Sequence, residues 1–88
     1  MPTFVVERYV PRSTAGDLRS EGERVARAAQ EQKGSDKSEV VYLHSIYLPD
    51  DEVSFCLFHS NSAEAVAEGF TLAQVAFDRV LEAELLEP

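Results

Sequence analysis

The spacing of apolar residues predicts three strands in the first two thirds of the chain. Residues Thr3 to Val10 are rich in β-branched and aromatic side chains, and Pro11 ends the run because proline has no N–H for a strand ladder. The strongest strand pattern is the apolar run from Glu39 to Leu48. The turn-forming residues 49–52 and a second apolar run, Val53 to His59, follow it, so these two strands are expected to form a hairpin.

Another segment has the spacing of a helix. From Ala15 to Lys33, apolar residues recur at near-helical intervals, and Gly34 is placed to end the helix. Gly22 lowers helix stability by roughly 1 kcal/mol relative to alanine, so we expect the N-terminal part of this helix to be irregular. Residues 34–38 are the expected flexible linker. Three side chains at the start of the helix provide candidate N-cap oxygens: Ser13, Thr14 and Asp17.

A second helix is predicted from Ala63 to about Gln74, with its N-cap in Ser60-Asn61-Ser62 and a weak point at Gly69. The last segment, Phe77 to Leu86, fits two interpretations. Its Leu, Ala and Glu content favours a helix, whereas its alternation favours a strand. A strand would divide its side chains between two faces: Leu81, Ala83 and Leu85 against Glu82 and Glu84.

The order of the elements favours the strand. A fourth strand beside the first covers the apolar edge that the first strand would otherwise expose, and it completes two right-handed βαβ units. The sequence therefore predicts a single α+β domain over residues 1–88. Its expected fold is a ferredoxin-like βαββαβ arrangement with a four-stranded antiparallel sheet in strand order 4-1-3-2.

Both hairpin strands are apolar on both faces, which predicts that a partner covers one face of the sheet. Regular alternation divides the second strand into two sets: Tyr42, His44, Ile46 and Leu48 against Val41, Leu43 and Tyr47. Two short helices cannot cover both faces, and a domain of 88 residues has a modest core of its own. A second copy of the chain is the simplest cover, so we expect a homodimer.

The composition limits which binding partners and which cellular location are expected. The formal net charge is −8 with only eight Lys and Arg residues, so neither nucleic acid nor an anionic membrane surface is an expected partner. The single cysteine, Cys56, rules out an intrachain disulfide and multi-cysteine zinc sites. No apolar run approaches the roughly 20 residues of a membrane span, and the first residues lack the features of a signal peptide, so a cytoplasmic location is expected.

Three residues are the candidate metal ligands: Glu7, His44 and His59. His44 lies within an apolar strand, where an imidazole requires a partner. If the hairpin loop has two or four residues, Tyr42 lies opposite His59 and His44 opposite Leu57. The two histidines are then diagonal neighbours on one face, with Cβ atoms roughly 7 Å apart. A three-residue loop would put them on opposite faces. For both histidines, a purely structural role is the alternative.

Glu7 is expected in a central strand, where its carboxylate requires a partner. Arg8 lies on the other face, which leaves His44, a tyrosine hydroxyl, a metal or the second subunit. The alternative to metal ligation is a salt bridge or hydrogen bond that holds the dimer. Cys56 is expected to be a buried, inert thiol. No residue is predicted to be catalytic, and the further pocket candidates are Tyr9, Tyr42, Ser45, Tyr47 and Cys56.

Five short motifs in the same order resemble a family of small bacterial proteins of unknown function, some of which are described as nickel-binding. The motifs are Phe4-Val5-Val6-Glu7-Arg8, Tyr42-Leu43-His44-Ser45-Ile46-Tyr47, Cys56-Leu57-Phe58, Ser62-Ala63-Glu64-Ala65 and Phe77-Asp78-Arg79-Val80. The chain departs from the family pattern at His59, where an acidic residue is usual, and at residues 74–76, where Gly-Leu-Pro is usual. The resemblance implies a dimeric α+β barrel with a strand at the C-terminus.

Two functions fit these observations. The first is a non-enzymatic cytoplasmic homodimer that binds Ni²⁺ or another divalent metal through imidazole and carboxylate donors. The second is a cofactor-free small-molecule enzyme or binder that uses the cavity between the two sheets of the dimer, with His44 and either Tyr47 or Tyr42 as an acid/base pair. No glycine-rich phosphate loop or Gly-x-Ser-x-Gly motif supports nucleotide binding or serine hydrolysis.

Overall fold

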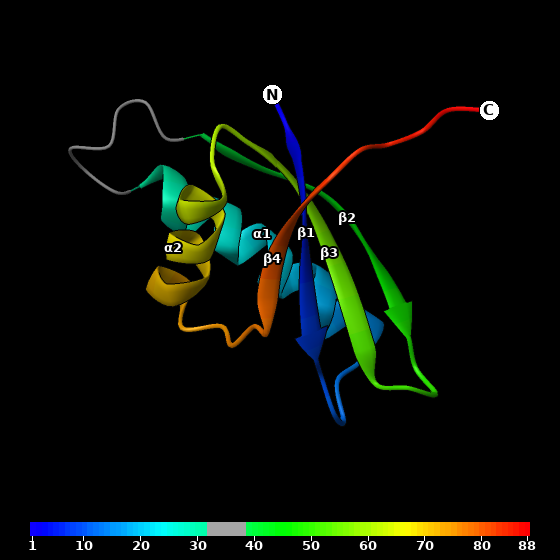
Figure 1. Ribbon diagram of the computed structural model, residues 1–88. Coiled ribbons are helices and arrows are strands. Elements are labelled where there is room, and N and C mark those ends of the chain that lie inside the picture. Colours follow the sequence, from blue (N-terminus) through cyan, green and yellow to red (C-terminus); the bar gives the residue numbers. More distant parts are fainter. Residues whose placement is uncertain (32–38) are drawn as a thin grey trace.

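The computed structural model describes residues 1–31 and 39–88, which form one four-stranded sheet and two helices (Figure 1). The elements follow the expected βαββαβ order: β1 (Thr3–Tyr9), α1 (Ala15–Gln30), β2 (Val40–Leu48), β3 (Val53–Ser60), α2 (Ala63–Ala73) and β4 (Arg79–Ala83). The sheet order is β2-β3-β1-β4 and all neighbours are antiparallel, which confirms the predicted topology. The predicted Gly34 cap and the linker 34–38 lie outside the described residues.

The C-terminal segment is a strand, as the alternation and the edge argument predicted, but it is shorter than residues 77–86. Only Arg79–Ala83 pairs with β1, and Phe77 and Asp78 belong to the connection from α2. Asp78 ties this connection to β1, because its N–H donates to the Glu7 carbonyl (2.9 Å) and its Oδ2 accepts from the Tyr9 N–H (2.7 Å). These two bonds position β4 along the edge of β1.

Helix α1 is regular throughout, so the expectation of an irregular N-terminal part is wrong. Thr14 is its N-cap and forms a capping box with Asp17, which satisfies backbone N–H groups of the first turn. Gly22 is present for a packing reason. A Cβ at Gly22 would lie 2.5 Å from Cε1 of Tyr42, so the missing side chain is what allows the Tyr42 ring to pack against the helix.

Helix α2 begins at the N-cap Ser62, whose hydroxyl accepts from the Ala65 N–H, and ends at Gln74 in a left-handed conformation. Gly69 brings α2 close to α1, because an added Cβ would lie 3.0 Å from the Val25 carbonyl oxygen. The two helices contact each other and pack on the same side of the sheet (Figure 1). The core between these layers consists mainly of buried residues from all parts of the chain: Phe4, Val6, Val25, Val40, Cys56, Phe58, Val66 and Phe70.

A β-bulge at Leu43 changes which β2 residues share a face. His44 lies opposite Leu57, as expected, but Tyr42 lies opposite Phe58 and Val41 opposite His59. The pairing of Tyr42 with His59 and the regular alternation along β2 are therefore wrong between residues 41 and 43. The extra residue moves Tyr42 to the helix side, where it packs against the core, and turns Val41 to the other side.

The other face of the sheet, called the open face below, is covered by neither of the two helices that the described residues form. Several apolar side chains on it are exposed, including Ile46 (52%), Leu81 (42%) and Val41 (38%). Val5 and Phe55 are half-buried on the same face. The sequence argument that two helices leave one apolar face uncovered thus holds for the single chain.

We predict that Gly22→Ala lowers the free energy of unfolding by about 1–3 kcal/mol, although alanine favours a helix. The Tyr42 ring cannot move away freely, because it packs on Phe58 at 5.5 Å between centroids and its hydroxyl is 2.7 Å from the Ser45 hydroxyl. Gly16→Ala is the matched control: nothing lies closer than 3.9 Å to its added Cβ. Urea unfolding should show the control unchanged or stabilised, and equal behaviour of the two variants would contradict this packing role.

Candidate functional site

A groove of about 650 Å³ runs between α1 and the edge strand β2. On the helix side Leu18 and Ala26 are buried and Arg19, Glu23 and Arg27 are exposed. On the strand side lie four of the residues that the sequence singled out: Tyr42, His44, Ser45 and Tyr47. The groove has the size and the mixture of apolar and polar groups that are typical of small-ligand sites.

Hydrogen bonds hold the strand side of this groove in place. The Tyr42 and Ser45 hydroxyls lie 2.7 Å apart, and the Tyr47 hydroxyl donates to the Ser13 carbonyl at 3.0 Å. At the other end, the Gln30 side chain donates to the Val40 carbonyl at 2.8 Å and links α1 to β2. Sequence reasoning had named the hydroxyl residues but did not place α1 beside them.

The two histidines lie on the open face. His44 is exposed and opposite Leu57, and His59 is half-buried and opposite Val41, with the Tyr42–Phe58 pair between these two pairs. Residues directly opposite each other in an antiparallel pair share a face, as do residues two apart in one strand, so His44 and His59 share the open face. The bulge changes the residues between them but leaves them on one side.

Glu7 also lies on the open face, but in a different row. It is opposite Phe55 on one side and Arg79 on the other, two strands away from β2. Its Oε1 accepts from Nε of Arg79 at 2.6 Å, and the two side chains are 31% and 62% exposed. The partner of Glu7 within the chain is therefore Arg79, which sequence reasoning had not considered. Directly opposite charges on neighbouring strands were the signal that could have found it.

Among the described residues, no three or more His, Cys, Asp or Glu side chains are grouped so that they could hold a metal ion. One chain thus places two imidazoles on a common face and keeps Glu7 apart from them. The assignment of Glu7, His44 and His59 as ligands remains a prediction. The other two pocket candidates, Tyr9 and Cys56, lie apart from the groove. Tyr9 is the last residue of β1 and is 62% exposed, whereas Cys56 is a free thiol that is fully buried in the core.

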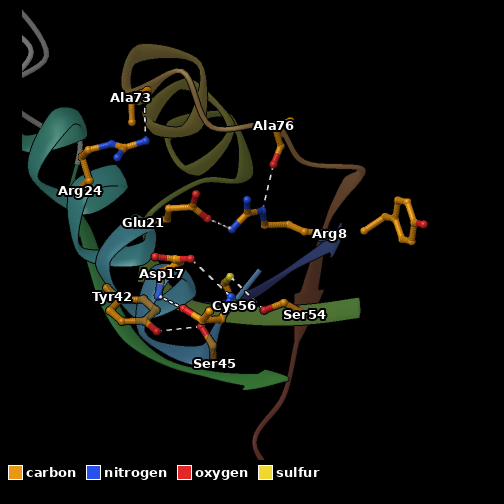
Figure 2. A network of polar contacts seen from close by, with 12 residues as sticks. Arg8, Asp17, Glu21, Arg24, Tyr42, Ser45, Ser54, Cys56, Ala73 and Ala76 are labelled. Atoms are coloured by element: carbon orange, nitrogen blue, oxygen red, sulfur yellow. Dashed lines mark hydrogen bonds and ion pairs between the residues drawn. The ribbon is translucent and has the colours of Figure 1, made fainter. Parts of the chain in front are cut away.

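A buried polar cluster on the helix side was not foreseen (Figure 2). Arg8 is 6% exposed, and its Nη1 lies 2.9 Å from Oε1 of Glu21 on α1. Its Nε donates to the Ala76 carbonyl at 2.9 Å, and its guanidinium is 6.0 Å from the Phe70 ring centre. This side chain joins β1 to α1 and to the connection before β4. The Ser54 and Cys56 side chains, 3.7 Å apart, lie on the same side of the sheet, and Ser54 is opposite Arg8 in the strand pairing.

Comparison with known families agrees with the motifs and the topology. The model of the family described as nickel responsive protein, SCO4226-like, matches residues 4–83. The chain belongs to the SCO4226-like family. The crystal structure of SCO4226 from Streptomyces coelicolor A3(2) has the same fold, with a TM-score of 0.76 over 97% of this chain and 99% of that chain, at 20% sequence identity. A search of curated proteins found no match.

Membership of the SCO4226-like family confirms the resemblance inferred from the five motifs, and the solved structure confirms the ferredoxin-like fold. The family description associates the family with a response to nickel. Within the described residues, neither helix is long and apolar enough to cross a membrane.

The Arg8 cluster and the Glu7–Arg79 pair allow a matched comparison of two arginines in this SCO4226-like domain. Arg8→Met should lower the free energy of unfolding by about 2–4 kcal/mol, because it removes the ion pair and the bond to Ala76 and leaves Glu21 without its partner. Arg79→Met should cost no more than about 1 kcal/mol, because that pair is solvent-exposed. Both are measured by urea unfolding; an equal loss in the two variants would contradict the structural role of Arg8.

Proposed function

We propose that the protein is a homodimer that packs two open sheet faces together and binds nickel or a similar divalent ion as a non-enzymatic buffer or sensor. The observation that carries this proposal is the location of the chain's only two histidines, which are neighbours on the one face that its own helices leave uncovered. The family's association with nickel supports the choice of metal.

The argument for the dimer rests on the exposed apolar side chains. Ile46 and Val41 on β2 and Leu81 on β4 are exposed on the two edge strands of the open face, and the half-buried Val5 and Phe55 lie on the strands between them. Apolar patches of this kind in small proteins usually mark an interface. Burial against a second copy would also add apolar area to a domain whose own core is small. Because a two-fold interface uses the same surface on both copies, it brings both histidine pairs to one layer.

The argument for the metal rests on donor type and number. Neutral imidazoles suit Ni²⁺, and a site needs more donors than His44 and His59 of one copy supply. A second copy doubles the imidazoles in the interface and brings its own Glu7 to the same layer. Glu7 is held by Arg79 within its chain, so it would have to exchange this partner to become a ligand. We therefore propose the imidazoles of His44 and His59, rather than the Glu7 carboxylate, as the main metal ligands.

The dimer is tested by measuring the mass in solution by light scattering. We expect twice the chain mass of 9.8 kDa for the wild-type protein and a single chain mass for Ile46→Asp, which buries a charge in the proposed interface. Leu72→Asp is the control, since Leu72 is 47% exposed but lies on α2, away from the open face. A monomeric wild-type protein, or equal dissociation by both variants, would refute the dimer.

Metal binding is tested by titrating NiCl₂ into the metal-free protein in a calorimeter. His44→Ala and His59→Ala should each weaken binding by about tenfold or more, because each removes a proposed donor. Asp51→Asn is the control for loose binding at the acidic turn between β2 and β3. Absence of heat with the wild-type protein, or unchanged affinity in His44→Ala, would rule out the site.

A further inference from the structure

We propose that the groove between α1 and β2 binds an elongated organic anion that carries a carboxylate at each end of an apolar chain. This site adjoins the open face along the edge strand β2, where Val41 and His44 border both, but it requires neither the dimer nor a metal. It rests on the charges and apolar surface that α1 presents to the edge of the sheet.

Two arginines of α1, Arg19 and Arg27, line the groove. They are eight residues apart on α1, which places their Cα atoms about 12 Å apart along the helix axis. Neither guanidinium has an ion-pair or hydrogen-bond partner among residues 1–31 and 39–88. In a chain of net charge −8 that holds only eight Lys and Arg residues, this groove is a local exception to the prevailing charge, because its described lining residues include two arginines and one carboxylate.

The middle of the groove favours an uncharged part of a ligand. Leu18 and Ala26 are buried at its base on the helix side, and the half-buried Tyr42 ring lies on the strand side. Glu23 is four residues from each arginine and, among the residues that the structure describes, carries the only carboxylate that lines the groove. Its charge repels an anionic group between the arginines, so two carboxylates are favoured only near Arg19 and near Arg27.

The strand side is rigid enough to keep this geometry. The Tyr42 and Ser45 hydroxyls bond to each other, the Tyr47 hydroxyl bonds to the Ser13 carbonyl, and Gly22 leaves room for the Tyr42 ring. A wall that is already held by such contacts loses little conformational freedom when a ligand binds. The arginine side chains are the parts that must become ordered.

The spacing of the arginines gives a length criterion. An extended decanedioate spans about 11 Å between its carboxyl carbons, close to the axial separation of the two arginine Cα atoms, whereas butanedioate spans about 4 Å. Decanedioate also supplies the apolar middle that the groove accommodates. Butanedioate would place a carboxylate near Glu23 whenever it contacts one arginine and extends along the groove.

The experiment is a titration of the ¹⁵N-labelled protein with decanedioate in low-salt buffer without metal, followed by amide chemical shifts. We expect saturable shifts confined to α1 and β2, and binding of butanedioate at least about threefold weaker. Arg19→Ala and Arg27→Ala should each weaken decanedioate binding about threefold to fivefold, the effect of one exposed ion pair. Arg12→Ala is the matched control, because it removes the same charge outside the groove and should leave the affinity unchanged.

The proposal is overturned if decanedioate causes no saturable shifts, if butanedioate binds as tightly, or if Arg12→Ala weakens binding as much as the groove variants. Shifts centred on Ile46 and Leu81 would also overturn it, because they would place the ligand on the open face. Since the titration contains no nickel, and the monomer expected from Ile46→Asp should bind decanedioate equally well, this result is independent of the proposed dimer and metal site.

Discussion

Both crossover connections of the chain place their helices on the same side of the sheet, and the remaining features depend on this constraint. Right-handed βαβ units built on one twisted sheet leave no other arrangement for α1 and α2. The covered side receives a core of aliphatic and aromatic side chains, whereas the other side keeps exposed apolar residues such as Ile46. The division of the molecule into a packed layer and an uncovered surface therefore follows from topology before any particular contact is considered.

Strand β1 shows how this division assigns different roles to adjacent charges. Arg8 points into the packed layer, where it pairs with Glu21 and the Ala76 carbonyl and joins three parts of the chain. Glu7 lies on the uncovered surface, where its pair with Arg79 is exposed to solvent. The Arg8–Glu21 pair therefore stabilises the packing of β1 against α1, whereas the Glu7–Arg79 pair can exchange partners, because water screens the exposed pair more strongly.

Strand β2 borders both regions that we associate with ligands. As an edge strand it forms one wall of the groove beneath α1, and its other face contributes His44 to the uncovered surface. The bulge at Leu43 makes this possible, since it turns Tyr42 toward α1 while Val41 faces the other way. Bulges of this kind frequently re-aim side chains at binding sites. A metal in the interface and an organic anion in the groove would both lie against this edge strand.

The sequence by itself determined the order of the elements, the sheet topology, the short segments that hold the two N-caps, the burial of Cys56 and the uncovered apolar face. These features follow from local patterns and from the rules of strand connection. Only the tertiary structure decided the face of Tyr42, the partner of Glu7, the burial of Arg8 and the reason for Gly22. Each of these depends on an extra residue in one strand or on a neighbour distant in sequence: Leu43, Arg79, Glu21 and Tyr42. Periodicity along a chain specifies which side of an element is apolar, but it contains no information on which distant side chain will lie against it.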